Sequence, residues 1–121
     1  MTHRFAVLVA LTFFAACTES SSDGGTACER SARMACEGAC ACTNPDGMCR
    51  IGDRVHTFEF ADETACLAFY LDYGCSMPNP GIDFDQCEMA LASATCVPDS
   101  SGPENQRFDQ PGACEVNGGP P

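Results

Sequence analysis

The chain begins with an apolar run and then changes abruptly to small polar residues. Residues Phe5–Ala16 are almost entirely apolar, whereas residues 18–26 contain no large apolar side chain. A run of 12 residues is too short to span a membrane, because a spanning helix needs about 20 apolar residues. A short apolar run behind the initiator methionine is typical of a removable signal peptide. We therefore expect residues 1–16 to be a signal peptide and residues 17–26 to form a flexible tether.

The spacing of small apolar residues predicts a first helix. Thr26 and Glu29 have the spacing of a capping box, in which each side chain bonds the backbone amide of the other residue. We expect Gly38 to end or weaken this helix. The apolar face at helical spacing consists of Cys28, Ala32, Ala35, Cys36 and Ala39.

A turn and an alternating segment follow the first helix. Residues Asn44–Gly47 have the sequence Asn-Pro-Asp-Gly, a strong turn signal because proline fixes its own φ and glycine accepts a positive φ. Residues 54–60 alternate, with their aromatic side chains on one side, which predicts a strand. We expect a small hairpin that closes at the turn and brings Cys42 opposite Cys49.

Two further helices are predicted, each beginning at an aspartate. Asp62 and Asp83 are placed to cap them, and Gly74 is expected to end the first of the two. Each helix carries two cysteines nine positions apart: Cys66 with Cys75, and Cys87 with Cys96. Nine helical steps cover about 13 Å, whereas a disulfide tolerates at most about 7 Å between Cα atoms. Each of these cysteines should therefore bond to another element.

The sequence predicts irregular structure for the C-terminal part of the domain. Residues 100–110 are polar and are predicted to form a loop, and residues 115–121 are expected to be a mobile tail. The whole pattern predicts a small disulfide-rich, mainly α fold with about three short helices and a small β-hairpin. We expect this domain to cover residues 27–114, a size at which the core alone buries a modest fraction of the surface.

The cysteine count indicates an exported disulfide scaffold. The chain has 11 cysteines in 121 residues, and setting Cys17 aside leaves an even number. The ten cysteines expected to be oxidised are Cys28, Cys36, Cys40, Cys42, Cys49, Cys66, Cys75, Cys87, Cys96 and Cys114.

Two specific disulfides are predicted from position along the chain. Cys42–Cys49 is expected because a tight turn brings its flanks together. Cys96–Cys114 is expected because Cys114 lies beyond a loop without apolar anchors and Cys96 is the nearest thiol in sequence. The remaining six cysteines are expected to link helices to one another: Cys28, Cys36, Cys40, Cys66, Cys75 and Cys87.

The charge balance is acidic and limits the classes of partner. The formal net charge is −11, and all six basic residues are arginine. Removal of residues 1–16 takes away Arg4 alone among the charged residues, which leaves −12. This charge argues against a nucleic-acid partner and against electrostatic docking onto an anionic membrane.

The junction between the apolar run and the tether resembles a known processing signal. Phe14-Ala15-Ala16-Cys17 resembles the lipobox of bacterial lipoprotein precursors, although that family prefers leucine where Phe14 stands. The resemblance implies cleavage before Cys17 and acylation of its thiol and new amine, so that the chain is anchored in a lipid bilayer. In that family, aspartate next to the cysteine often signals retention in the inner membrane. Thr18 stands at that position here, so the resemblance implies the outer membrane. Cleavage after Cys17 by an ordinary signal peptidase is the alternative.

The architecture as a whole carries a second resemblance. The lipobox, the Ser/Gly-rich tether, the two C-x8-C helices and the closing Cys114 resemble the small cysteine-rich lipoproteins of predatory Gram-negative bacteria of myxobacterial type. This resemblance implies a location in the cell envelope and no defined activity.

Candidate catalytic residues are few. His56 is the single histidine left after signal removal, and no nucleophile lies near it in sequence, so we interpret it as structural. The Cys40-Ala41-Cys42 segment lacks the strand–helix surroundings of a thioredoxin-like redox motif. The two tyrosines and Phe69 share helical spacing, which is more typical of a core than of a binding stripe. We expect no enzymatic activity.

Candidate metal ligands are equally weak, and we expect no metal and no cofactor. The cysteines that might be read as a zinc cluster lack paired C-x2-C spacing: Cys36, Cys40, Cys42 and Cys49. Asp83, Asp85 and Glu88 lack the loop spacing of an EF-hand. Acids at the start of a helix are favoured by its dipole, which explains them without a metal.

Two functional classes remain open from the sequence. The first is an exported, membrane-anchored structural or binding module of the cell envelope that contacts an unknown envelope or extracellular protein. The alternative is an exported, disulfide-stapled effector such as a hydrolase inhibitor, for which Met77–Gly81 is the candidate contact loop.

Overall fold

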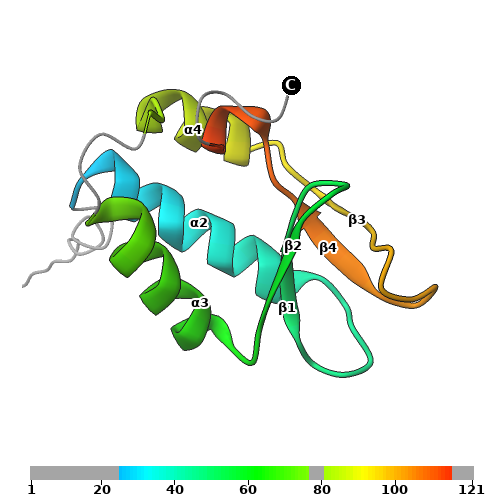
Figure 1. The fold of residues 1–121 in the computed structure, drawn as a ribbon. Coiled ribbons are helices and arrows are strands. Elements are labelled where there is room, and N and C mark those ends of the chain that lie inside the picture. The colour runs from blue at the N-terminus through cyan, green and yellow to red at the C-terminus, as the bar shows by residue number, and fades with distance from the viewer. Residues whose placement is uncertain (1–24, 77–80, 116–121) are drawn as a thin grey trace, which may run out of the picture.

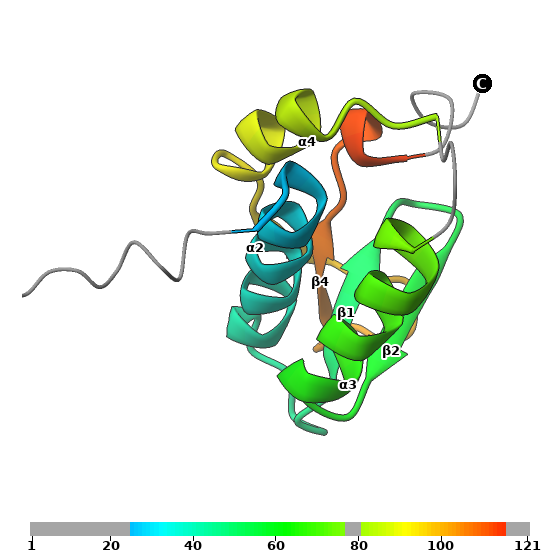
Figure 2. The same cartoon turned by 90° about the vertical axis from the view of Figure 1, so that its left-hand side faces the viewer.

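The computed structural model describes residues 25–76 and 81–115, which form a layer of helices against a sheet. In chain order the elements are α2 (Ala27–Ala41), β1 (Cys49–Gly52), β2 (Thr57–Phe60), α3 (Glu63–Phe69), the π-helix η1 (Tyr70–Cys75), α4 (Phe84–Leu91), β3 (Cys96–Pro98), β4 (Gln106–Asp109) and the 3-10 helix η2 (Gly112–Cys114). Helices α2 and α3 lie side by side on one side of the sheet, and α4 packs against α2 (Figures 1 and 2).

The fold class is mixed α/β, so the prediction of a mainly α fold with one small hairpin is correct only for the helices. The sheet has four strands in the order β2-β1-β4-β3. β1 is antiparallel to β2 and parallel to β4, and β4 is antiparallel to β3. The prediction of a loop over residues 100–110 is wrong for β4. Its sequence, Gln-Arg-Phe-Asp, is largely polar, and its parallel partner β1 lies far away along the chain.

The helices begin where the sequence predicts, because each start is fixed by a side chain. The Thr26 amide donates to Glu29 Oε1 at 2.9 Å, and the Glu29 amide donates to Thr26 Oγ1 at 3.1 Å, which completes the capping box. Asp62 Oδ1 accepts from the Ala65 amide at 2.8 Å, and Asp83 caps α4 in the same manner. These contacts span three residues or fewer and are therefore visible in the sequence.

Both glycines expected to stop helices lie inside helical segments. Helix α2 continues past Gly38 to Ala41. A Cβ atom at Gly38 would overlap the Phe108 ring of β4, so glycine is required there for close approach of the helix to the sheet. Gly74 lies within η1, which ends one residue later at Cys75.

The hairpin lies further along the chain than predicted. The turn at residues 44–47 is present, with the Gly47 amide donating to the Asn44 carbonyl at 3.0 Å and a φ of 75° at Gly47. It leads from α2 into β1, however, and β1 pairs with β2. The connection between these strands is held by Asp53 Oδ1, which accepts from the Val55 and His56 amides at 2.7 Å each.

The two faces of the sheet differ in character because side chains alternate along each strand. Ile51 of β1 is 1% exposed and stands opposite Phe58 of β2 and Phe108 of β4 on the helix side. On the other face the Arg50 guanidinium donates to Glu59 Oε2 at 2.8 Å, and Arg107 donates to the Gly52 carbonyl at 3.2 Å.

All ten cysteines of the described part are paired, which is characteristic of an oxidising, extracytosolic environment. Two disulfides link the helices α2 and α3–η1, one ties α2 to β1, one ties the end of α2 to β3, and one ties α4 to η2. The pairs are Cys28–Cys75, Cys36–Cys66, Cys40–Cys49, Cys42–Cys96 and Cys87–Cys114.

Both specific disulfide predictions are wrong. Cys49 bonds to Cys40 and Cys42 bonds to Cys96, because the predicted hairpin around residues 44–47 does not form. Cys114 bonds to Cys87, because β4 carries the chain away from Cys96 and η2 then packs against α4. The expectation that neither C-x8-C pair closes on itself is correct. Of the six cysteines expected to link helices, Cys40 and Cys87 bond outside them, the former to a strand and the latter to η2.

Candidate functional site

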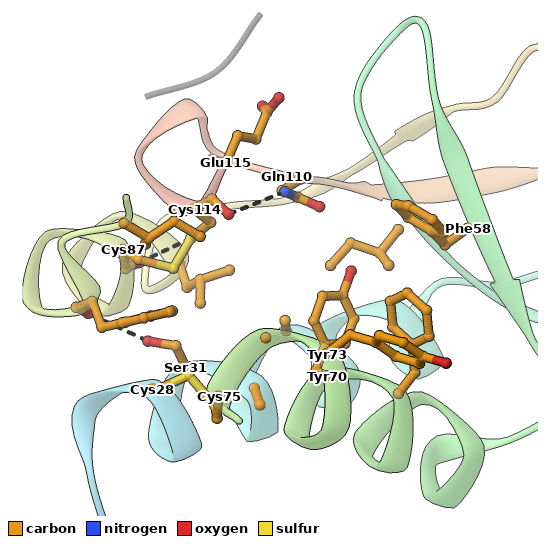
Figure 3. A pocket seen from close by; sticks show the side chains of 18 residues that line it. Cys28, Ser31, Phe58, Tyr70, Tyr73, Cys75, Cys87, Gln110, Cys114 and Glu115 are labelled. Carbon is orange, nitrogen blue, oxygen red and sulfur yellow. Dashed lines mark hydrogen bonds between the residues drawn. A yellow bond between two sulfur atoms is a disulfide. The ribbon is translucent and has the colours of Figure 1, made fainter. Parts of the chain in front are cut away.

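A cavity of about 250 Å³ opens between the helices and one end of the sheet. Figure 3 shows Phe58, Tyr70 and Tyr73 on one side of it and the Cys87–Cys114 disulfide with Glu115 on the other. The lining residues come from every described helix, from β1 and β2, and from irregular segments beside α4 and η2: Cys28, Ser31, Ala32, Ala35, Ile51, Phe58, Phe69, Tyr70, Tyr73, Gly74, Cys75, Ile82, Phe84, Cys87, Leu91, Gln110, Cys114 and Glu115.

Small side chains on α2 leave the space for this cavity. Ser31, Ala32 and Ala35 lie on the buried face of α2 and also line the cavity. They face larger apolar groups, including Ile51 and Leu91, both of which belong to the buried core. The stripe of small residues that predicts the helix from sequence is therefore also the wall that keeps the cavity open.

Aromatic rings form the opposite wall and extend to the surface. The Phe69 ring centroid lies 5.4 Å from that of Phe58 and 5.2 Å from that of Tyr73. Phe58 is 44% exposed and Tyr73 is 63% exposed, so both present ring surface to solvent at the opening. The prediction that Phe69 and the tyrosines are core residues is wrong for Tyr73.

The Tyr70 hydroxyl is the unusual polar group in this region. Its oxygen is fully buried and has no hydrogen-bond partner among the described residues. Burial raises the pKa of the Tyr70 phenol well above its ordinary value. The group therefore stays neutral.

The remaining polar groups of the lining are partly engaged. Ser31 Oγ donates to the Phe84 carbonyl at 3.4 Å, and Gln110 Nε2 donates to the Cys114 carbonyl at 3.3 Å. These bonds brace the segments around the cavity and leave its interior surface largely apolar.

Within residues 25–76 and 81–115, Glu115 is the single charged residue that lines the cavity. Burial raises the pKa of its carboxyl, and the neighbouring carboxylates Asp53 and Asp109 raise it further, while His56 acts in the opposite direction. No arginine lines the cavity among the described residues, so the charge that these residues place at the opening is negative.

Two disulfides hold the cavity walls in place. Cys28–Cys75 joins the first turn of α2 to the last residue of η1 across 5.7 Å between Cα atoms. Cys87–Cys114 joins α4 to η2 across 4.7 Å. All four residues line the cavity, so its frame is covalently closed on both sides.

The residues singled out from sequence as possible chemistry do not converge on one place. His56 is exposed in the connection between β1 and β2. Cys40 and Cys42 bond to different partners. Glu88 pairs with Arg30 at 2.9 Å, in keeping with a structural role. Within residues 25–76 and 81–115, no group of three or more His, Cys, Asp or Glu residues is arranged to hold a metal ion.

Several sequence predictions fall outside the part of the chain that the structure describes. Cys17 and the signal peptide precede it. Four of the five residues of the proposed contact loop, 77–80, lie in the internal gap, and residues 116–121 of the predicted mobile tail follow the last described residue. In the described residues, no helix has both the length and the apolar character needed to cross a membrane.

Comparisons of the chain with protein-family models, with curated proteins and with solved structures give no match. The sequence contained one signal for the cavity, the run of small residues on α2. Nothing in the sequence indicated that Ile51, Phe58 and Leu91 line one cavity, because they lie on different elements.

Proposed function

We propose that this protein is an exported, membrane-anchored lipoprotein of the bacterial cell envelope that acts as a binding module. The lipobox-like segment ending at Cys17, the Ser/Gly-rich tether and the outer-membrane preference implied by Thr18 support the anchoring. Five disulfides in a small domain support residence in an oxidising compartment.

The apolar cavity is the observation that carries the binding role. Ligand sites are typically concave and mostly apolar, with a small number of polar groups at the edge. The cavity between α2, η1 and α4 has these properties, and its walls are joined by Cys28–Cys75 and Cys87–Cys114. Walls that disulfides already hold together lose little conformational entropy when a ligand binds, which favours affinity.

The residues that line the cavity fit a binding site better than an active site. In the described part of the chain, the cavity wall contains no histidine, and its four cysteines are all in disulfides. Ser31 donates to a backbone carbonyl, and Glu115 has no nucleophile–base partner in the lining.

An NMR titration with an uncharged apolar probe tests this function. The probe is isopropylbenzene, and the protein is the oxidised exported chain carrying Cys17→Ser to keep it in solution. Binding should shift resonances of the lining residues, including Ala35 and Ile51.

A variant that narrows the cavity should abolish those shifts. Gly74→Leu adds a side chain at the wall, where a new Cβ would have Tyr70 Cδ1 as its nearest neighbour at 3.9 Å. Ala68→Leu adds the same side chain at an exposed position of α3 away from the cavity and should leave binding intact. Absence of saturable binding, or equal loss in both variants, would contradict the proposal.

A further inference from the structure

The cavity favours one class of ligand by its size, its ring surfaces and its charge. An apolar cavity of about 150 Å³ in another protein holds benzene. The cavity here is about 250 Å³, which accommodates one ring with a short branched substituent. This volume lies below the range that begins at about 300 Å³ for drug-sized ligands, so it suits a smaller apolar group.

The opening carries exposed aromatic rings. Phe58 and Tyr73 are both exposed there and are linked through Phe69, with ring centroids 5.4 Å and 5.2 Å from the Phe69 centroid. The face of an aromatic ring is electron-rich and attracts cations placed within about 6 Å of its centroid. Exposed aromatic rings across the cavity from Glu115 make the opening more favourable to a cation than to an anion (Figure 3).

The charged groups near the opening are mostly carboxylates, which favour a cation as the aromatic rings do. Glu115 lines the cavity, and the carboxylates Asp53 and Asp109 and the imidazole of His56 lie close enough to influence it. Asp53 comes from the connection between β1 and β2, and Asp109 from the end of β4, so these acids converge on Glu115 from separate elements. The mature chain as a whole is strongly acidic. An anionic head group is therefore disfavoured at both short and long range.

From these observations we infer that the ligand is a small cationic amphiphile, with one apolar ring in the cavity and an ammonium group at the opening on the side of Glu115. The head group keeps part of its hydration there, because Glu115 is only half-buried. This inference rests on the proposed binding function and adds the chemical class of the ligand.

Two probes of matched shape test the inference. The 1-phenylethylammonium ion and isopropylbenzene differ in one group, an ammonium in place of a methyl. Binding of each is measured by NMR titration to the oxidised exported chain and to its Glu115→Gln variant. Glu104→Gln removes an exposed acid that does not line the cavity and serves as the matched control.

Glu115→Gln should weaken binding of the ammonium probe by about 2- to 5-fold, the range expected for a partly exposed ion pair. Binding of isopropylbenzene should not weaken, and Glu104→Gln should change neither affinity. Added salt should weaken binding of the ammonium probe alone.

The outcomes separate this inference from the function on which it rests. If isopropylbenzene binds and the ammonium probe is insensitive to Glu115→Gln, the charge preference is wrong and the binding function stands. Binding of 2-phenylpropanoate, an anion of similar shape, as tightly as the ammonium probe would also overturn the preference. If neither the ammonium probe nor isopropylbenzene binds, both the preference and the function are wrong.

Discussion

The buried hydroxyl of Tyr70 shows how one atom can lower stability within a well-packed wall. A buried polar group without a hydrogen bond costs about 1–3 kcal/mol relative to the unfolded chain, where water satisfies it. The ring itself is well placed, since its centroid lies 5.3 Å from that of Phe69 and 6.1 Å from that of Phe60. The penalty is therefore confined to the oxygen.

Tyr70→Phe should raise the free energy of unfolding by about 1 kcal/mol, because it removes the unpartnered oxygen and keeps the ring. Denaturant unfolding of the oxidised chain measures the change. Tyr73→Phe is the matched control and should have almost no effect, because Tyr73 is 63% exposed. A loss of stability in Tyr70→Phe would mean that the hydroxyl has a partner such as a bound water.

The buried guanidinium of Arg50 makes stability depend on pH. Its Nη2 donates to Asp46 Oδ2 at 2.6 Å, and its Nε donates to Glu59. The hydrogen bond from Arg50, followed by that from the Met48 amide, holds the pKa of Asp46 below its ordinary value.

Asp46→Asn should destabilise the protein at neutral pH and have a smaller effect in acid. The lowered pKa in the folded state means that the stabilisation is present above the unfolded pKa of about 3.9. It is lost as the pH falls through the lower, folded-state pKa. Unfolding free energies of both proteins, measured between about pH 2.5 and pH 7, should therefore converge at low pH. A difference that stays constant across this range would contradict the ion-pair explanation.

At the scale of elements, the disulfides differ in how much chain they close. Cys42–Cys96 spans 54 positions and ties α2 to the distant edge strand β3. Cys40–Cys49 spans nine positions and ties α2 to the next element. In the chain-entropy model the longer loop restricts the unfolded state more strongly.

Removal of these two bonds by paired alanine substitutions should therefore have unequal effects. We expect a loss of about 4 kcal/mol for Cys42→Ala with Cys96→Ala, and about 2.5 kcal/mol for Cys40→Ala with Cys49→Ala. The pairs are well matched, since each has one buried and one half-buried cysteine. Denaturant unfolding gives the order, and peptide mapping without reduction verifies the pairing. An inverted order would show that packing around the sulfurs outweighs chain entropy.

For the whole molecule, the proposed lipid anchor would determine where the proposed binding module works. A diacylated, N-acylated Cys17 would hold the domain stably at a membrane, whereas a single chain binds only marginally. If residues 18–26 form the tether that the sequence predicts, the cavity would be free to reach a ligand near that surface.

Cys17→Ser should release the protein from the membrane fraction, and intact mass of the unaltered protein should show acyl chains on a chain that begins at Cys17. Thr18→Asp should preserve acylation and move the protein to the inner membrane, because the resemblance to bacterial lipoproteins assigns that effect to aspartate at this position. A soluble, unmodified chain beginning at Thr18 would contradict lipidation.

Local features of this fold could be predicted from sequence because they depend on neighbours within a few residues. The capping contacts of Thr26 and Asp62 and the turn at residues 44–47 are set by hydrogen bonds of this range. The even number of cysteines after Cys17 likewise follows from the sequence alone and indicates an exported scaffold. The small side chains on α2 also marked a buried face.

The tertiary structure alone decided the sheet, the disulfide pairing and the cavity. β4 forms because the chain returns to pair beside β1, which places Phe108 under Gly38 and leaves Cys114 next to Cys87. Local sequence cannot rank such contacts, because their free energy depends on the path of the whole chain rather than on nearby residues. The cavity has the same origin, because its walls come together only when α2, η1 and α4 pack against one another.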